Sequence, residues 1–428
     1  MIIVDSELER REKNGNPIRV AMVGAGYMGR GIALQIEQYM TGMRLVAIAN
    51  RTLSAAKKAY RDAGVDSIKR VESITQLEAA ITAGQHAVTD DAMLICEAAG
   101  IDVIIEATGD VEHSAHVALK AIKNQKHLVL MNAELDATVG PILKVYADRA
   151  GVIISNADGD QPGVMMNLYR FVKSIGYQPL LAGNIKGLQD YYRTPETQKG
   201  FAAEHHITPQ MATSFADGTK ISMENAIVAN ATGFRVGQRG MYGPRCNHVK
   251  ETVDLFPIDQ LLNGGLVDYI LGAEPGPGVF VLGYNTDAVR RDYMKYFKMG
   301  DGPLYVFYVP YHLPHLEVPL TAARVVLFKD AAVAPLGAPV CDVITLAKRD
   351  LKAGEVLDGI GGFTCYGMIE NSEICQSGNL LPMGLSEECS IKRDISKDQV
   401  ITYEDVNLPE SRLCVRLREE QNAYFSDQ

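Results

Sequence analysis

Short runs of hydrophobic residues alternate with helical patterns over about the first 160 residues. The runs cover residues 18–23, 45–50, 102–109, 127–132 and 151–155, and a short helical pattern over about the first twelve residues precedes them. Continuous apolar runs of this length are typical of strands that are buried on both faces. Their alternation with helices predicts an α/β chain whose N-terminal part is a Rossmann domain, a doubly wound parallel sheet.

A glycine turn follows the first run directly and opens a helical pattern. Residues 24–29 read GAGYMG. Gly24 allows the tight turn, Gly26 lets backbone N–H groups approach a pyrophosphate, and Gly29 lets the helix pack on the strand. The free N–H groups of the helix N-terminus then face the phosphates. This strand–turn–helix context predicts a dinucleotide-binding site.

The end of the second run indicates which dinucleotide binds. NAD-specific folds place Asp or Glu there to hold the ribose 2′-hydroxyl, but this chain has Asn50, Arg51 and Thr52. No carboxylate repels a 2′-phosphate, and Arg51 is able to bind one, so we expect NADP rather than NAD. The expected cofactor contacts are Gly24, Gly26, Tyr27, Met28, Gly29, Asn50, Arg51, Thr52, Ala107, Thr108, Gly109 and Asn132.

The pattern changes after about residue 160. Strand-like patches at 180–185 and 221–225 mix with long loops rich in glycine and proline, at 233–244 and 272–278. Long ordered loops in a compact domain are usually functional, so we expect an α+β catalytic domain. The segment 319–327 has an apolar helical face and is expected to return to the first domain.

The last ninety or so residues contain an internal repeat. Residues 347–351 read AKRDL, and residues 391–395 read IKRDI, 44 positions later. Two copies of one short strand–turn unit predict a pseudo-two-fold, all-β module. The expected domains are therefore 1–158, 159–335 and 336–428.

Composition narrows the functional classes. The chain has 428 residues, and about 150 residues per domain gives a prior near three domains. No apolar stretch reaches 18 residues, so we expect no membrane partner. The net charge of −10 argues against a nucleic-acid partner and leaves a small-molecule substrate. Seven cysteines without CxxC spacing, after a start that resembles no signal peptide, predict free buried thiols and a cytoplasmic location.

Two charged residues after the patch at 180–185 are candidates for proton transfer. Lys186 and Asp190 are four positions apart and share one face if their segment is helical. A lysine whose pKa is lowered by burial serves as general acid/base in hydride transfer, and an Asp one turn away orients it. An ordinary surface ion pair stays the alternative.

Four further candidates lie in turns and loops. Asp160, with Glu134, either positions substrate hydroxyls or holds Mg²⁺ or Mn²⁺, unless Asp160 simply belongs to a capped turn. Arg245 follows a glycine-rich loop and either clamps an oxyanion or is a structural residue. His312, in a proline-bounded loop, is either catalytic or structural. No Cys or His residues show the spacing of a zinc site, so we assign none of them as metal ligands.

Parts of the chain resemble known families. The first 330 residues resemble the homoserine-dehydrogenase-like oxidoreductases in the glycine turn, in residues 102–109 and in the strand that ends at Asn132. The tail resembles a SAF domain, a β-clip module, in its repeated Lys-Arg-Asp units and in residues 381–385. The whole arrangement resembles the deoxyxylulose-phosphate-reductoisomerase-like proteins in four stretches: 88–91, 229–233, 243–245 and 311–319.

These resemblances imply an NAD(P)-dependent oxidoreductase with a homo-oligomeric assembly. Homoserine dehydrogenases carry Asn-Lys where this chain has Asn132 and Ala133, which argues against homoserine itself. The expected activity is NADP(H)-dependent hydride transfer at a carbonyl or alcohol of a small polyhydroxylated substrate, phosphorylated or not, with or without isomerisation. Homoserine dehydrogenase and a non-catalytic protein that senses the cofactor stay as alternatives.

Overall fold

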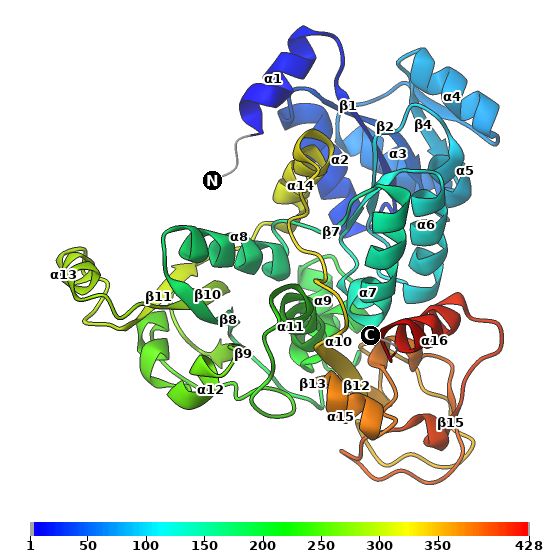
Figure 1. The fold of residues 1–428 in the computed structure, drawn as a ribbon. Helices are drawn as coiled ribbons and strands as arrows, with labels where there is room; N and C mark the ends of the chain where they lie inside the picture. The colour runs from blue at the N-terminus through cyan, green and yellow to red at the C-terminus, as the bar shows by residue number, and fades with distance from the viewer. Residues whose placement is uncertain (1–3, 427–428) are drawn as a thin grey trace. The chain divides into compact units, whose positions relative to one another are not determined.

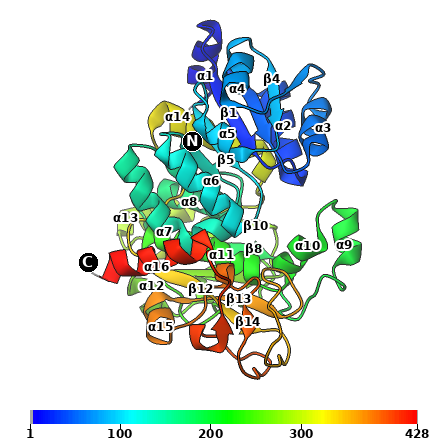
Figure 2. The same cartoon turned by 90° about the vertical axis from the view of Figure 1, so that its right-hand side faces the viewer.

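The computed structural model describes residues 4–426, which form two compact units (Figure 1, Figure 2). Unit 1 contains residues up to 160, residues 313–334 and the chain from 416 onward. Unit 2 contains residues 161–312 and 335–415. The expected catalytic segment and most of the tail thus fall in one unit, while the boundaries of the three expected domains stay predictions.

Unit 1 is built on a seven-stranded parallel sheet with the order β3-β4-β2-β1-β5-β6-β7. The strands are β1 (Ile18–Val23), β2 (Met43–Ala49), β3 (Ile68–Arg70), β4 (His86–Thr89), β5 (Val103–Glu106), β6 (His127–Leu130) and β7 (Ile154–Asn156). The chain leaves β1 in one direction and returns to its other side as β5. In such sheets, ligands bind where the order reverses, outside the carboxyl ends of the strands. The predicted doubly wound sheet is confirmed.

Helices cover both faces of this sheet (Figure 1). They are α1 (Asp5–Lys13), α2 (Tyr27–Tyr39), α3 (Leu53–Asp62), α4 (Ile74–Thr82), α5 (Ala92–Glu97), α6 (Val111–Lys123), α7 (Ala133–Ala150) and α14 (Pro314–Phe328). Val318 and Ala322 of α14 are fully buried in one core with Ile32 of α2. The expected return of segment 319–327 to the first domain is therefore confirmed.

The last helix of the described chain, α16 (Leu413–Ser426), completes the backbone hydrogen bonds of α7. Pro141 lies inside α7 and has no N–H, which disturbs the helical ladder around it. Ile142 donates its N–H to Oε1 of Gln421 at 3.2 Å, and Arg418 donates to the carbonyl oxygen of Thr138 at 3.1 Å. The expectation of an all-β tail is therefore wrong, because residues 413–426 are rich in Leu, Arg, Glu and Gln, which favour helix.

Unit 2 contains a four-stranded mixed sheet with the order β11-β10-β8-β9. Its strands are β8 (Gln178–Lys186), β9 (Leu266–Leu271), β10 (Gly278–Tyr284) and β11 (Leu304–Val309). Only the β8–β9 pair is parallel. The helices of this part are α8 (Gln161–Ser174), α9 (Lys199–Glu204), α10 (Pro209–Ala216), α11 (Thr219–Thr232), the 3₁₀ helix η1 (Val249–Asp254), α12 (Ile258–Leu262) and α13 (Ala288–Tyr296).

One predicted strand of unit 2 is correct and the other is wrong. Residues 180–185 lie in β8, whereas residues 221–225 lie in the helix α11. Every residue of α11 from Ile221 to Ala231 is buried. A helix that is buried on all sides lacks the polar stripe that reveals helical periodicity, and a short window of it is easily taken for a buried strand.

Residues 336–412 form a C-terminal module that lies along α11 (Figure 2). It contains β12 (Cys341–Ala347), β13 (Cys365–Asn371), α15 (Ser372–Ser377), η2 (Met383–Leu385), β14 (Ser390–Ile391), η3 (Tyr403–Asp405) and β15 (Val406–Asn407). The predicted repeat is confirmed, because its two copies exchange equivalent hydrogen bonds. Leu351 N–H donates to Ile395 O at 2.8 Å, and Ile395 N–H donates back to Leu351 O at 3.0 Å.

All seven cysteines are buried with free thiols, as expected. Burial raises the pKa of the Cys96 thiol to about 12, so this group stays protonated and unreactive at neutral pH. Among residues 4–426, no helix is long and apolar enough to cross a membrane.

A pH-dependent contribution to stability comes from Asp136 in the first turn of α7. Burial raises the pKa of Asp136 from 3.8 to about 7, opposed by a 3.4 Å hydrogen bond from Asn156. Between these two values the folded state keeps a proton that the unfolded chain has released. The free energy of unfolding therefore falls as the pH rises through this window, by at most about 1.4 kcal/mol per pH unit from this group.

We predict that Asp136→Asn removes this contribution. Urea unfolding at pH 5 and at pH 8 should show a smaller loss of stability on going to the higher pH than in the wild type. An unchanged difference between the two pH values would contradict the assignment. Asp148→Asn, at the exposed end of the same helix, serves as the control.

Candidate functional site

The glycine turn of unit 1 has the geometry that a dinucleotide requires. Gly24 has a φ of +104°, and a Cβ there would lie 2.6 Å from the carbonyl oxygen of Ala107. A Cβ on Gly29 would lie 2.5 Å from the carbonyl oxygen of Gly24. Gly26 precedes α2, and no heavy atom lies within 4 Å of the position of its Cβ. Glycine at position 24 therefore allows the turn to approach the backbone of Ala107, and glycine at position 29 allows α2 to approach the turn. Gly26 leaves open space in which a phosphate can lie.

Asn50, directly after β2, holds the glycine turn in place. Its Oδ1 accepts the N–H of Ala25 at 3.0 Å, and its Nδ2 donates to the carbonyl oxygen of Thr52 at 2.9 Å. Arg51 between them is exposed and makes no hydrogen bond or ion pair with the described residues. Thr52 precedes α3 and makes no side-chain cap. Arg51 and the first turn of α3 are thus available to an anionic group.

A buried polar network fixes the ends of β5 and β6. Glu106 accepts the N–H of Thr108 at 2.9 Å and also its hydroxyl. The hydroxyls of Thr108 and Ser114 are 2.9 Å apart, and Asn132 Nδ2 donates to Ser114 at 3.0 Å. Burial raises the pKa of Glu106, whose Oε2 has no hydrogen-bond partner among residues 4–426. Sequence reasoning missed Glu106, although a carboxylate that ends an apolar strand is an unusual feature.

Two of the expected acidic residues, Asp160 and Glu134, lie in the first unit. Asp160 is buried, and so is the neighbouring Asp158, whose N–H donates to Thr321 Oγ1 at 2.7 Å. Burial, and then the charge of Asp158, raises the pKa of Glu317 on α14. In the part of the chain that the structure describes, no three His, Cys, Asp or Glu side chains gather to hold a metal ion. The described residues therefore offer no set of three such ligands for the Mg²⁺ or Mn²⁺ ion that the sequence suggested.

The sheet of unit 2 places Lys186 and Arg245 on one face. Lys186 pairs with Leu271 in the parallel β8–β9 ladder, and Leu271 pairs with Arg245 in the next bridge. Residues that are in register across a sheet direct their side chains to the same face. Asn184 pairs with Tyr269 two positions earlier and shares this face. Lys186 is half-buried and Arg245 is exposed, so both are accessible to a ligand.

A second buried polar network lies beside Lys186. Asn184 Nδ2 donates to Gln161 Oε1 at 2.7 Å and to Glu224 Oε2 at 3.1 Å. Asn225 Nδ2 donates to Asn184 Oδ1 at 2.7 Å. The first turn of α11 carries Lys220, one turn before Glu224. Sequence reasoning missed these α11 residues, because it assigned residues 221–225 to a strand.

The expected helical arrangement of Lys186 and Asp190 is wrong. Lys186 is the last residue of β8, and residues 187–194, the post-β8 loop, follow it. Asp190 accepts the N–H of Tyr192 at 3.1 Å and the Nε–H of Arg193 at 3.0 Å. Asp190 therefore shapes this loop. Gly187 at the end of the strand and Pro195 beyond the loop both disfavour a helix here.

Asp268 holds the glycine-rich loop before Arg245. Its carboxylate accepts the N–H groups of Tyr242 and Gly243, each at 2.9 Å. Burial raises the pKa of Asp268 to about 6, and these hydrogen bonds oppose the rise. His312 lies in the loop after β11 and is half-buried, and its role stays a prediction.

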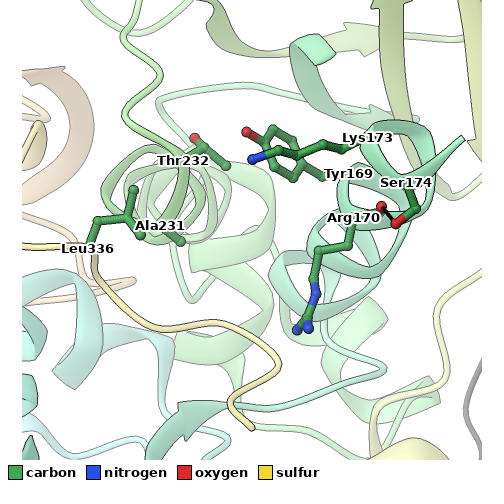
Figure 3. Close-up of a pocket in the computed structure, with 7 residues that line it drawn as sticks. All are labelled: Tyr169, Arg170, Lys173, Ser174, Ala231, Thr232 and Leu336. Atoms are coloured by element: carbon green, nitrogen blue, oxygen red, sulfur yellow. Dashed lines mark hydrogen bonds between the residues drawn. The ribbon is translucent and has the colours of Figure 1, made fainter. Parts of the chain in front are cut away.

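A hollow of about 530 Å³ opens elsewhere on unit 2 (Figure 3). Tyr169 and Lys173 extend from α8 toward Thr232 at the end of α11. Ser174 donates to the carbonyl oxygen of Arg170 at 2.6 Å. None of the predicted site residues lines this hollow.

Two family models match different parts of this chain. Residues 24–154 match the family model of the homoserine dehydrogenase NAD-binding domain, and residues 159–318 match that of the catalytic domain of the oxidoreductase DRL. Each of these two models describes a domain of an oxidoreductase, and together they cover most of this chain. A homoserine dehydrogenase of Methylobacillus glycogenes is 29% identical over 121 residues, which are 28% of this chain and 26% of that protein. The chain thus spans about a quarter of the length of that relative.

Solved structures show weaker similarity to this chain. A probable dehydrogenase from Thermotoga maritima is 12% identical, with a TM-score of 0.44, over 75% of this chain and 91% of that one. The apo scyllo-inositol dehydrogenase of Lactobacillus casei is 12% identical, with a TM-score of 0.42, over 74% of this chain and 89% of that one. Similarity at this level decides nothing about the substrate.

The two glycines of the turn should respond differently to substitution. We predict that Gly24→Ala lowers both stability and cofactor affinity, because its Cβ would clash with the backbone of Ala107 at a φ that only glycine adopts freely. Gly26→Ala should leave the unfolding midpoint nearly unchanged and lower cofactor affinity, since its Cβ enters the space expected for the phosphate. Thermal unfolding and cofactor titration of both variants provide the check, and a Gly26→Ala enzyme with wild-type affinity would contradict the assigned phosphate position.

Proposed function

We propose that this oxidoreductase uses NADP(H) to transfer a hydride to or from a carbonyl or alcohol carbon of a small, polyhydroxylated, anionic substrate. The observation that carries this proposal is the shared sheet face of Lys186 and Arg245 beside the Asn184 network. A guanidinium binds phosphate or carboxylate through two parallel hydrogen bonds. The face thus offers one group for the substrate's anion and one for its reacting oxygen.

Lys186 supplies the proton in this scheme. The bound cofactor supplies or receives the hydride. In the reducing direction, the Lys186 ammonium donates a proton to the carbonyl oxygen as the carbon receives the hydride. In the oxidising direction, the neutral amine takes that proton from the hydroxyl. Asn184 and its partners fix the strand that carries Lys186, and Arg245 holds the substrate at its anionic end.

Further parts of the proposal concern the whole protein. We infer a SAF-type C-terminal module, a cytoplasmic location and a homo-oligomeric assembly. Exposed aromatic side chains on and just after α13 support assembly, since Tyr293, Tyr296 and Phe297 are 61%, 78% and 66% exposed. This helix lies between β10 and β11, at the outer end of the hairpin they form (Figure 1).

Substitution of Lys186 tests its role as proton donor. In assays with a panel of aldehydes, ketoses and sugar phosphates, Lys186→Ala should lower kcat by about 100- to 10,000-fold and change KM little. Lys199→Ala, on the exposed surface of α9, should keep wild-type activity. Near-normal turnover by Lys186→Ala would refute the assignment. If only Lys220→Ala lost turnover, the proton donor would instead be Lys220 on α11. Product analysis with each active sugar phosphate shows whether isomerisation accompanies reduction.

The second prediction concerns cofactor choice. The wild type should have a lower KM for NADPH than for NADH, because Arg51 is free to pair with the 2′-phosphate. Arg51→Asp should raise the KM for NADPH by about 10- to 100-fold, since a charge-assisted hydrogen bond is replaced by repulsion. The KM for NADH should change little. A wild-type preference for NADH would overturn the NADP assignment.

Two other functions are decided by the same assays. The match of residues 24–154 to the homoserine dehydrogenase NAD-binding domain makes homoserine a necessary member of the panel. Turnover of homoserine, with none of sugar substrates, would favour homoserine dehydrogenase. Tight NADP(H) binding without turnover of any substrate would favour a cofactor sensor.

A further inference from the structure

We propose that the C-terminal module is the positioning element of the substrate site, and that Asp398 is its positioning residue for the loop that follows Lys186. This inference rests on the proposed function, because it assigns a catalytic role to the face that carries Lys186 and Arg245. It concerns residues that touch neither substrate nor cofactor in that scheme.

Three successive residues of the post-β8 loop are each held by the C-terminal module. The ring of Tyr191 stacks on Tyr366 of β13, with centroids 5.2 Å apart. Tyr192 donates its hydroxyl to Asp398 at 2.9 Å. The carbonyl oxygen of Arg193 accepts a 2.9 Å hydrogen bond from Lys348. The loop after Lys186 is therefore attached to the module at three successive residues, in addition to the hydrogen bonds that Asp190 makes within it.

Asp398 is the centre of this contact. Its second carboxylate oxygen accepts the hydroxyl of Tyr366 at 3.0 Å, so one carboxylate joins a loop tyrosine to a strand tyrosine. The ammonium of the adjacent Lys397 lies 3.4 Å from the centroid of the Tyr192 ring. Hydroxyl, carboxylate and ammonium together fix the ring of Tyr192 against the module.

The internal repeat shows that Asp398 is not needed for the turn in which it lies. Its counterpart 44 positions earlier is Gly354. Both have left-handed φ values, +64° for Asp398 and +89° for Gly354, and both donate an equivalent backbone hydrogen bond to the other copy. Glycine adopts this conformation without strain, whereas Asp tolerates it at a cost. The second copy of the repeat therefore has a residue that is less favourable than glycine in this conformation. The Asp398 carboxylate hydrogen-bonds to Tyr192 and Tyr366, which both lie outside the repeat.

The same module holds the other two elements of the face. Gly367 of β13 donates its N–H to Thr219 Oγ1 at 2.8 Å, at the start of α11. Arg239, in the glycine-rich loop before Arg245, donates to Glu370 at 2.8 Å, and Gly240 donates its N–H to Ile369 O at 2.8 Å. Arg239 therefore links the glycine-rich loop to β13. Strand β13 thus contacts the post-β8 loop, the start of α11 and the glycine-rich loop before Arg245.

The test removes the carboxylate without disturbing the turn. In Asp398→Gly the turn acquires the residue of its sister copy, so the unfolding midpoint should stay close to the wild-type value. Amide hydrogen exchange in residues 187–194 should become faster, independently of any substrate. With a substrate that the wild type turns over, kcat should fall by about 10- to 100-fold and KM should change less, as expected for a displaced catalytic group.

Two further variants complete the design. Asp398→Asn keeps an acceptor and tolerates the left-handed conformation, so it should restore part of both exchange protection and kcat. Glu404→Ala removes an exposed carboxylate from the same module without a loop contact and should match the wild type.

Unchanged exchange in Asp398→Gly, or faster exchange with unchanged kcat, would overturn the proposal. Failure of the proposed function has a different signature. If Lys186→Ala is fully active while Asp398→Gly loses kcat, the proton donor is wrong and the positioning role stands.

Discussion

The architecture of unit 2 depends on one buried ion pair. The Lys348 ammonium lies in an almost fully buried position and donates to Asp217 Oδ2, to Arg193 O and to Gly362 O, at 2.9, 2.9 and 2.8 Å. All three of its N–H groups are thus satisfied, which a buried ammonium requires. Burial raises the pKa of Asp217, and Lys348 opposes the rise. Removing one partner of such a pair typically costs about 3–5 kcal/mol, since the other charge is left buried.

This pair explains why a catalytic segment and a tail far apart in sequence form one compact unit. Asp217 also accepts the N–H of Thr219 at 3.0 Å, so the ion pair sets the position at which α11 begins. The equivalent lysine in the second copy of the repeat, Lys392, is exposed. The two copies have diverged, because only one of them faces α11.

The parts of the molecule with strong local signals were predictable from sequence. The Rossmann sheet, the glycine turn and the repeat each have a fixed spacing of apolar residues, glycines or charges, and the structure contains all three. The shared sheet face of Lys186 and Arg245 was beyond such reasoning, because it depends on the register of Leu271 in β9 with two distant segments. The Asn184 network was equally hidden. Buried Asn, Gln and Glu side chains in α8, β8 and α11 have no periodic signature until their elements are brought together.

The contact between α16 and α7 has a consequence for synthesis of the chain. Ile142 and Thr138 belong to an early helix of the first unit, whereas their partners Gln421 and Arg418 follow them 279 and 280 positions later. Domains of long chains generally fold as units in the order in which they leave the ribosome. Here unit 1 is still open at α7 until residues 161–415, which include all of unit 2, have been made. The closure of unit 1 therefore follows the synthesis of unit 2.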